Sequence, residues 1–446
     1  MNPPLSTIQA FSHLLSDGSS DFDEELELEK LRAEIVSKIR DNHESESLVN
    51  DLDIKIALLV KNSISIEEVM RAAKKKGRKN EASEKKFSLK ALDKEHRDKL
   101  QCYQHLFYLL QTQPRYLTSL LFYIGPNKIK HFMENVVLAL FAYAQNTREE
   151  YLLLKLVEHT MQAEIEKMPD VQSILREDMI FIKLIVQYNR GAKERQYLRD
   201  LLSPLVSTVI SDSDLDLETD PLVIYRAMIK EEESKTGEKS ALPFDAPRDE
   251  ALENENVRAI YINRLKNLQA VTTQFLTAII ASLKNMPFGL RFMAKSFRKI
   301  LESKFPEEDK NEISGAIGNL VYYRYMNPAI VAPEAFDVLE SVISQKERKN
   351  LAEVSKMLQH IAMDKKFEDE FTYLLPLNDF VSSAHEAFVK YFLEVTNVAD
   401  AEDYFEMDAY KDLIETQTPV IYISPVEIAT THSMLNKFLD EIVIYI

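Results

Sequence analysis

Two clusters of basic side chains are the residues most able to bind an anionic group in this sequence. Members of the first cluster fall within about three helical turns, and those of the second have i, i+4, i+7 and i+8 spacing, which places them on one helix face. The clusters consist of Arg190, Lys193, Arg195 and Arg199, and of Arg291, Lys295, Arg298 and Lys299. Such faces suit a phosphate or an acidic protein surface. Alternatively, each cluster pairs with nearby acids such as Glu194 and Asp200 and remains a solvated helix face.

Arg324 is a third candidate, because it lies between an aromatic run and a proline. Leu320-Val321-Tyr322-Tyr323 can end a buried helix, and Asn327-Pro328-Ala329 predicts a turn, since the residue before proline avoids helical ψ. An arginine held there can donate to loop carbonyls through its planar guanidinium. We therefore predict a buried support role, in which Arg324→Ala lowers thermal stability.

Self-contained catalysis finds no support in the sequence. There is no Gly-rich phosphate loop with a lysine, no His-Glu-x-x-His, no Cys-x-x-Cys and no Gly-x-Ser-x-Gly. The nine histidines are scattered, so neither a metal site nor a cofactor is predicted. The single cysteine, Cys102, excludes an internal disulfide, and we expect it to be a small core residue beside Tyr103 and Leu106.

Composition points to an acidic globular protein. Lys plus Arg number 55 and Asp plus Glu 72, so the net charge is −17 and binding of nucleic acid is not expected. No apolar run is long enough to span a bilayer, and the N-terminus lacks the pattern of a secretory signal, which predicts a cytoplasmic location.

The elements that must position these residues are predicted to be helices. Glycine (8) and proline (16) are scarce, which disfavours a fold with many tight turns. Apolar residues recur at helical spacing, Pro114 should interrupt one helix, and Thr147 should cap another. Later helical windows cover residues 180–210, 221–235, 254–284, 290–304, 312–325 and 351–392, whereas 420–424 alternates weakly, as in an extended segment. These patterns predict an all-α protein.

Several segments of the sequence match the residue patterns of a known protein family. Tyr323-Arg324-Tyr325-Met326-Asn327-Pro328-Ala329-Ile330-Val331 resembles the Phe-Leu-Arg-Phe-x-x-Pro-Ala-Ile signature of Ras GTPase-activating domains, and its longer Tyr-Tyr-Arg-Tyr-Met-Asn-Pro form resembles the IQGAP branch. Further matching segments are 103–112, 148–154, 189–192, 219–225 and 418–424. The resemblance implies a RasGAP-like helical domain with a helical extra domain built from flanking helices, in a cytokinesis scaffold of fungal or other non-animal origin. The implied organisation is a disordered acidic lead-in at 1–25, N-terminal flanking helices at 26–125, the central domain at 126–365, and C-terminal flanking helices and tail at 366–446.

The resemblance also assigns roles to individual residues. RasGAPs insert an arginine finger into the GTPase active site, and alignment through residues 198–206 puts Ile180 at that position, so no catalytic residue is assigned. Arg176 and Arg190 are the basic residues close enough to act as a finger instead. The resemblance makes Arg324, with Asn327 and Pro328, the support of the finger loop. Implied partner-binding residues are Arg176, Arg190, Lys193, Arg291, Lys295, Tyr323 and Lys356.

The resulting hypothesis is a non-catalytic module that binds a GTP-loaded small GTPase of the Rho/Cdc42 or Ras type. Two alternatives remain open, namely an active GTPase-activating protein and a vestigial interaction domain that binds no GTPase. For the full-length protein the resemblance implies actin and calmodulin as partners, and a location at the cytoskeleton, cell cortex or contractile ring.

Overall fold

The computed structural model describes residues 94–244, 246–339, 341, 343–406, 421 and 423–444. The chain divides into two compact units, 1–100 and 101–446, and the fold reported below is that of the second. The predicted lead-in at 1–25, the helical segments up to residue 93, and Val420 and Tyr422 of the predicted extended segment lie outside the described residues.

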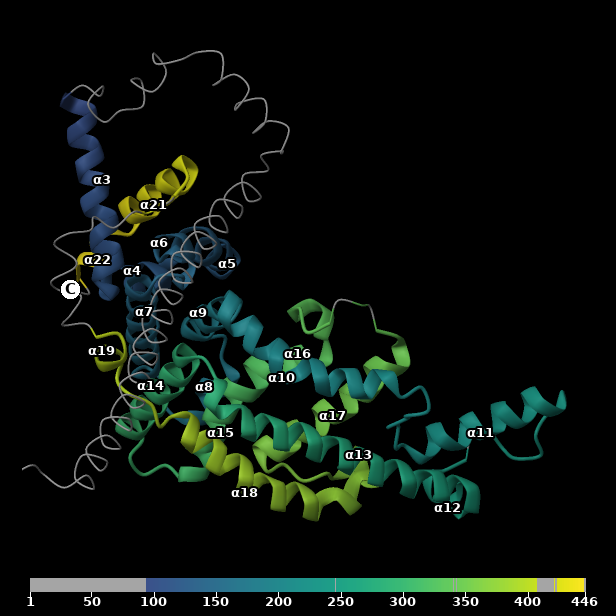
Figure 1. Cartoon of the computed structure of the whole chain (residues 1–446). Coiled ribbons are helices and arrows are strands. Elements are labelled where there is room, and N and C mark those ends of the chain that lie inside the picture. The colour runs from purple at the N-terminus through teal and green to yellow at the C-terminus, as the bar shows by residue number, and fades with distance from the viewer. Residues whose placement is uncertain are drawn as a thin grey trace, which may run out of the picture. The chain divides into compact units, whose positions relative to one another are not determined.

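Every regular element in the described part of the chain is helical, which confirms the all-α prediction (Figure 1). The α-helices are α3 (Lys94–Thr112), α4 (Pro114–Tyr123), α5 (Pro126–Phe132), α6 (Leu138–Leu140), α7 (Thr147–Ile165), α8 (Val171–Arg176), α9 (Ile180–Tyr188), α10 (Ala192–Ser211), α11 (Pro221–Thr236), α12 (Arg248–Glu253), α13 (Glu255–Ala281), α14 (Phe288–Lys304), α15 (Lys310–Gly318), α16 (Asn327–Val331), α17 (Gln345–Met363), α18 (Asn378–Val395), α19 (Ala401–Tyr404), α21 (Pro425–Lys437) and α22 (Leu439–Ile444). Two π-helices, Met133–Val137 and Asn319–Met326, and short 3₁₀ segments join some of them.

Prolines and turn residues set the helix ends. Pro114 begins α4 after Gln113 takes an extended conformation, which confirms the predicted interruption. The window predicted as one helix over 180–210 is instead two helices, because the turn at Asn189–Gly191 separates α9 from α10. The cap predicted at Thr147 is also wrong, since Asn146 occupies the N-cap position of α7.

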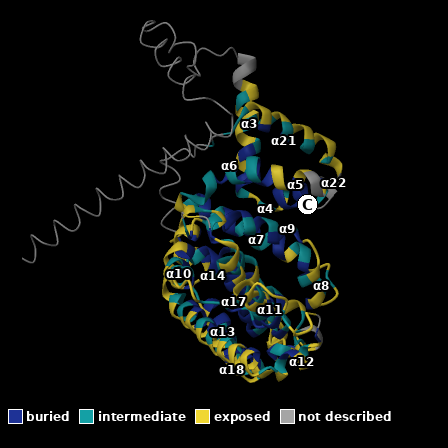
Figure 2. Cartoon of the chain, turned by 90° about the vertical axis from the view of Figure 1, so that its right-hand side faces the viewer, coloured by how far each residue is buried: buried dark blue, intermediate teal, exposed yellow. Residues whose placement is uncertain are grey.

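The core is organised around α7, which packs against α4, α9 and α14. Its buried face repeats every three or four residues, the spacing of one side of a helix, and includes Leu153, Leu156, Val157 and Met161. Figure 2 shows the exposed residues along the outer faces of α10 and α18, away from this centre. Burial of this apolar stripe, at roughly 25 cal/mol per Å², holds the helices together.

The flanking helices pair with one another. The last two helices, α21 and α22, pack against the π-helix Met133–Val137 and against α4 respectively. Phe438 stacks on Tyr123 with ring centroids 5.4 Å apart, and His432 meets the edge of Tyr103 at 5.9 Å. Cys102, directly before Tyr103 on α3, is exposed, so the prediction that it is a core residue is wrong.

Candidate functional site

The signature segment lies in the π-helix Asn319–Met326, which continues from α15 and runs directly into α16. Asn327 has helical φ and ψ of −57° and −45°, so the turn predicted at Asn327-Pro328 is wrong. Proline usually breaks a helix because it lacks an N–H and its ring meets the i−4 carbonyl. Here the backbone hydrogen bond spans five residues, as in a π-helix, because the Asn327 N–H donates to the Tyr322 carbonyl. Pro328 lies in the first turn of α16, where a helix needs no N–H from it.

A pocket of about 340 Å³, here called the signature pocket, opens beside this π-helix. Its lining residues are Val186, Asn189, Arg190, Tyr323, Arg324, Tyr325, Asn327, Pro328 and Phe336. The pocket thus brings together five residues selected from the sequence: Arg190, Tyr323, Arg324, Asn327 and Pro328. The other candidates, Arg176, Ile180, Lys193, Arg291, Lys295 and Lys356, do not line it.

Two tyrosines of the signature fix the wall of the pocket. The buried Tyr325 hydroxyl donates to the Glu194 carbonyl at 2.7 Å, which joins the π-helix to the start of α10. The buried Tyr322 hydroxyl donates to Asn327 Oδ1 at 3.2 Å and to the Ser355 carbonyl at 3.3 Å. The Ser355 hydroxyl also donates to Asn327 Oδ1. Asn327 therefore links α16 to α17 through a side-chain hydrogen bond.

Arg324 is half-buried, and its partners differ from the loop carbonyls that the sequence predicted. Its Nε donates to Asn319 Oδ1 at 3.4 Å, and its guanidinium carbon lies 5.9 Å from the centroid of the Tyr323 ring. In the described part of the chain, no backbone carbonyl accepts a hydrogen bond from Arg324. Tyr323 is 40% exposed, so an arginine and an accessible aromatic ring stand side by side at the pocket.

The turn between α9 and α10 supplies the opposite wall. Arg190 is exposed, and it donates to Glu134 at 3.2 Å and to Gln187 at 3.4 Å. The neighbouring Asn189 is only 8% exposed, and its side-chain amide has no hydrogen-bond partner among the described residues. Asn189 belongs to the segment 189–192, which resembles the IQGAP branch. Neither its residue type nor its position in the sequence predicted that its amide would be buried in this pocket.

The position assigned to the finger lies at the start of α9. Ile180 is partly buried against the core, and its backbone N–H donates to Glu164 Oε1 at 2.9 Å. The next N–H, of Phe181, donates to Glu164 Oε2 at 2.8 Å. Burial raises the pKa of the Glu164 carboxyl, although both backbone donors favour its charged form. Arg176 ends α8 and is exposed.

Ile180 and the signature pocket belong to opposite ends of α9. The helix contributes Val186, near its C-terminal end, and Asn189 directly follows its last residue. At a rise of about 1.5 Å per residue, nine residues separate Ile180 from Asn189 by roughly 13 Å along the axis. The role of Arg324 as support for a finger loop at residue 180 therefore stays a prediction.

The basic face of α14 is occupied by the chain itself. Arg291 donates to the carbonyls of Val395, Glu394 and Asn397 at 3.2, 3.1 and 2.7 Å, and so binds the C-terminal end of α18. Arg298 donates to the Thr396 hydroxyl at 3.1 Å. The cluster was correctly placed on one face, but the face is covered by residues about one hundred positions later in the chain.

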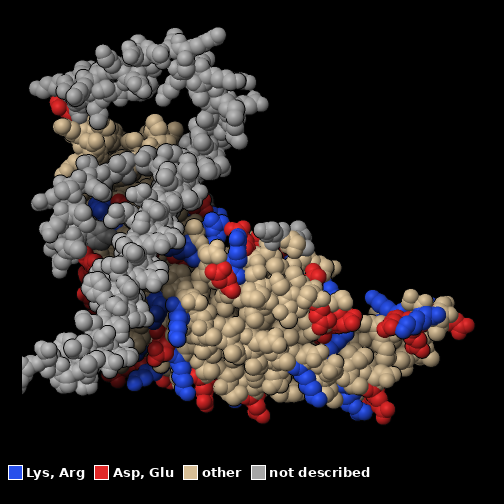
Figure 3. Space-filling view, viewed as in Figure 1, with Lys and Arg blue, Asp and Glu red and all other residues tan. Residues whose placement is uncertain are grey.

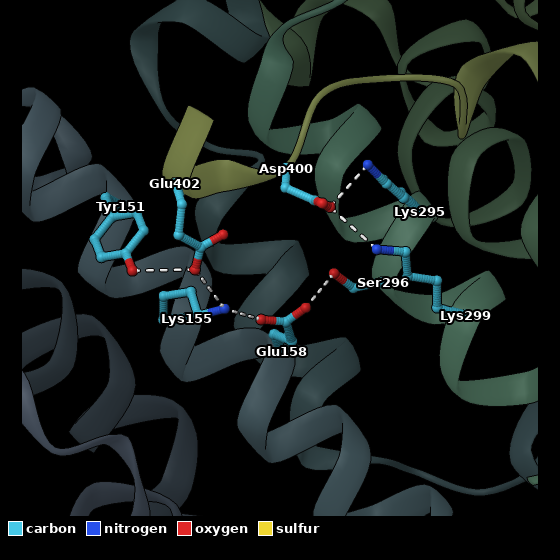
Figure 4. A network of polar contacts seen from close by, with 8 residues as sticks. All are labelled: Tyr151, Lys155, Glu158, Lys295, Ser296, Lys299, Asp400 and Glu402. Atoms are coloured by element: carbon cyan, nitrogen blue, oxygen red, sulfur yellow. Dashed lines mark hydrogen bonds and ion pairs between the residues drawn. The ribbon is translucent and has the colours of Figure 1, made fainter. Parts of the chain in front are cut away.

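The acidic segment beyond α18 completes this cover. Asp400 lies between Lys295 and Lys299, with Nζ–Oδ1 distances of 2.9 and 3.0 Å (Figure 4). Hydrogen bonds from the two ammonium groups lower the pKa of Asp400 to about 2. Glu402 receives Lys155 at 3.2 Å and the Tyr151 hydroxyl at 3.2 Å. Arg291 and Lys295, predicted to bind a partner, are thus engaged within the fold.

Lys193 also has an internal partner, the buried carboxylate of Glu150. The Nζ–Oε2 distance is 2.9 Å, and the Tyr188 hydroxyl donates to the other oxygen of Glu150 at 2.9 Å. Glu194 is 4% exposed, and its burial, with a contribution from the charge of Glu150, raises its pKa to about 7. Lys193 and Glu194 lie in the first turn of α10, directly after the Asn189–Gly191 turn.

The remaining basic candidates follow the same pattern. Lys356 bonds to both oxygens of Glu353 at 2.7 and 2.8 Å, one turn earlier on α17. Arg195 bonds to the Asp337 carboxylate at 2.8 Å and Arg199 to its carbonyl at 2.7 Å. Pairing with acids was the predicted alternative for the first cluster, but the partners differ from the Glu194 and Asp200 that were expected.

The surface carries both signs of charge. On the face drawn in Figure 3, acidic and basic side chains lie next to one another and form no broad field of one sign. Among the described residues, no group of three or more His, Cys, Asp or Glu side chains could hold a metal ion. No helix in that part of the chain has the length and apolar character needed to cross a membrane.

Comparison with known proteins identifies the domain to which the signature pocket belongs. The sequence profile of a family described as GTPase-activator protein for Ras-like GTPase matches residues 156–363. The human Ras GTPase-activating-like protein IQGAP2 is 43% identical over 452 residues, which cover 99% of this chain. The chain contains a RasGAP-related domain of the IQGAP type. The signature pocket lies within the residues that this domain occupies.

Two further relatives come from distant organisms. Ras GTPase-activating-like protein rgaA of Dictyostelium discoideum is 37% identical over 418 residues, covering 94% of this chain and 50% of its own length. Ras GTPase-activating-like protein rng2 of Schizosaccharomyces pombe is 32% identical over 454 residues, covering 99% of this chain and 30% of its own length. The chain is more similar to the human relative than to either of these two, so the expectation of a non-animal source gains no support. The chain spans 29% of the length of human IQGAP2.

Proposed function

We propose that the chain is a non-catalytic binding module for a small GTPase of the Rho/Cdc42 or Ras type, in its GTP-loaded state. One contrast carries the proposal. The signature pocket presents Arg190, Arg324 and an exposed Tyr323, whereas the finger position holds a partly buried isoleucine. The first arrangement suits an acidic protein surface, and the second has no charge to bring to a phosphate.

Loss of the finger removes the main chemical contribution of a GTPase-activating protein. An arginine finger stabilises charge on the transferring phosphoryl group and contributes about 10³ to 10⁵ in rate. Isoleucine offers neither a charge nor a side-chain donor. The Ile180 backbone N–H is also unavailable to a phosphate, because Glu164 accepts its hydrogen bond.

A module that binds without catalysis still changes the state of its partner. If affinity is higher for the GTP-bound form than for the GDP-bound form, binding stabilises the GTP-bound form by mass action. This is the behaviour expected of an effector or of a scaffold that holds an active GTPase in place.

Single-turnover GTP hydrolysis, with the purified chain and a panel of Rho- and Ras-type GTPases, tests the proposal. We expect nucleotide-dependent binding together with a hydrolysis rate that is unchanged or lower. Acceleration by about a hundredfold or more would require a finger and would overturn the non-catalytic assignment.

The first rival is an active GTPase-activating protein that uses Arg176 or Arg190. Arg176 is exposed at the end of α8, four residues before Ile180, and supports this rival better than Arg190, which is bonded to Glu134 and Gln187. If the rival holds, Arg176→Ala abolishes acceleration and leaves binding intact. Arg190→Ala gives the same test for the second residue.

The second rival is a vestigial domain without GTPase affinity. Pairing of Lys193, Lys356 and the α14 cations with internal acids supports it, because those charges already have partners. It predicts no binding in the GTP-analogue state and no effect of Lys356→Glu. Contacts of a longer protein with actin and calmodulin, and a cytoskeletal or cortical location, are proposals that rest on the family resemblance alone.

A further inference from the structure

A second pocket, here called the α10–α14 pocket, opens between α10 and the start of α14. Its volume is about 750 Å³, and the residues that line it include Lys193, Asp200, Phe288 and Tyr404. It shares no lining residue with the signature pocket. Arg190 of the signature pocket and Lys193 of this one are nevertheless only three residues apart, so their backbones lie within roughly 11 Å of each other.

Tyr404 gives the α10–α14 pocket an accessible aromatic ring in a fixed position. Phe288 stacks on the ring with a centroid distance of 3.6 Å and an angle of 3° between the planes. Phe405 meets it at 4.9 Å and 89°. Tyr404 is 54% exposed, so the exposed area of its ring belongs to the edge and to the face that Phe288 does not cover. Such a face attracts a cation, and a ring already held in place loses little conformational entropy on binding.

The charges of the α10–α14 pocket also favour a cation. Its charged lining residues are Glu150, Lys193 and Asp200. Lys193 pairs with Glu150 at 2.9 Å, and these two opposite charges offset each other. Asp200 is exposed and accepts a hydrogen bond at 2.7 Å from the neutral Gln196, and it has no cationic partner among the described residues. The pocket therefore keeps one negative charge, whereas the signature pocket presents two arginines.

We propose that the α10–α14 pocket receives a basic side chain, an arginine or a lysine, of the same GTPase that binds at the signature pocket. Tyr404 contacts the cation with its ring, and Asp200 supplies the opposite charge. Nine residues line the signature pocket, fewer than the roughly 20–30 on one side of a standard protein interface, so a protein bound there extends over neighbouring surface.

This inference rests on the proposed function and deepens it, because it specifies the chemistry of the partner. The contact surface of the GTPase combines an acidic segment, for Arg190 and Arg324, with a basic residue nearby. A GTPase in which either sign is reversed places like charges together and is rejected.

Tyr404→Leu and Asp200→Asn test the inference. The first removes the ring and keeps an apolar side chain, and the second removes the charge and nearly keeps the shape. We expect each to weaken the Kd by about three- to fivefold, the effect of an exposed cation–π contact or ion pair. The measurement is isothermal titration calorimetry of the full chain with the member of the Rho- and Ras-type panel that binds most tightly, loaded with a GTP analogue.

Two variants serve as matched controls. Tyr404→Phe keeps the aromatic ring, and Asp214→Asn removes an equal charge from the exposed loop between α10 and α11, which lines neither pocket. Both should bind within about twofold of the wild type. Thermal unfolding monitored by circular dichroism verifies that each variant is folded. Because Asp200 is exposed, D200N still tests the inference where Y404L does not fold.

The outcomes separate the inference from the function on which it rests. If the wild-type chain binds no GTPase in the panel, both are wrong. If the wild type binds and the folded Y404L and D200N variants bind equally well, the inference alone is wrong. Tighter binding by D200N would place an acidic group in the α10–α14 pocket and would overturn the inference. So would an equal loss in D214N, which identifies overall charge as the cause, or in Y404F, which identifies the hydroxyl.

Discussion

The Glu164 carboxylate on α7 accepts the backbone N–H of Ile180, the first residue of α9, at 2.9 Å. Its second oxygen accepts the next N–H of the same helix. The first N–H groups of a helix have no partner within the helix, and a carboxylate satisfies them while it complements the helix dipole. A side chain from a different helix therefore fixes the position where a finger arginine is expected.

Replacing Glu164 with glutamine should destabilise the chain. An amide has one acceptor oxygen, so one N–H of α9 loses its bond and meets an NH₂ group instead. We expect a loss of about 1–3 kcal/mol in the free energy of unfolding, the cost of one unsatisfied buried donor. Urea unfolding measures this loss. A Glu164→Gln chain as stable as the wild type would show that the two bonds are dispensable.

Glu194 should make stability depend on pH near neutrality. Its folded pKa of about 7 lies above its ordinary value of 4.5, so the folded state binds the proton more tightly. Its contribution to stability is full below about pH 4.5 and is lost as the pH rises towards about 7, by about 3 kcal/mol. Glu194→Gln should remove this slope when urea midpoints are compared across that range. Identical slopes for the two chains would exclude Glu194 as its source.

Arg291→Ala should lower stability and leave GTPase affinity unchanged. The guanidinium bonds to three carbonyls where α18 ends, the carbonyls of Glu394, Val395 and Asn397, and so stabilises the last turn of that helix. Because Arg291 is partly exposed, we expect a loss of about 1–2 kcal/mol rather than the full value of three charged bonds. Thermal unfolding and a binding titration report the two quantities separately. Weaker binding by the folded variant would restore Arg291 as a contact residue.

Arg324→Ala should lower GTPase affinity and leave stability nearly unchanged. The sequence predicted a buried arginine whose loss lowers thermal stability, but the structure gives it a half-buried position and one long hydrogen bond. We now expect a stability change below about 1 kcal/mol and a fall in affinity of about tenfold. A sharp fall in the melting temperature would instead support the buried role that the sequence predicts for Arg324.

Local patterns in the sequence predicted local structure well. Apolar spacing located most helices, and Pro114 marked a true break, because both effects act within a few residues. The signature was likewise recognised from adjacent residues, and Arg190, Tyr323, Arg324, Asn327 and Pro328, but not the other predicted site residues, line one pocket.

Contacts between distant segments could not be predicted in this way. The i, i+4 spacing of Arg291 and Lys295 indicates a basic face, but not that residues 394–400 cover it. From the sequence alone, Glu164 is indistinguishable from an exposed acid on a helix surface. Only the packing of α7 on α9 brings its carboxylate to the backbone of Ile180. The burial of the Asn189 amide likewise depends on how α9 meets the π-helix.

The π-helix Asn319–Met326 also constrains how the signature can be engineered. A π-helical stretch behaves as a helix that has gained an extra residue, so the faces before and after it are rotated relative to each other. The directions of the side chains in the Tyr-Tyr-Arg-Tyr run depend on this added length as well as on residue type. Deletion of one residue there would reset the phase of every later side chain in the helix, an alteration that no point substitution can reproduce.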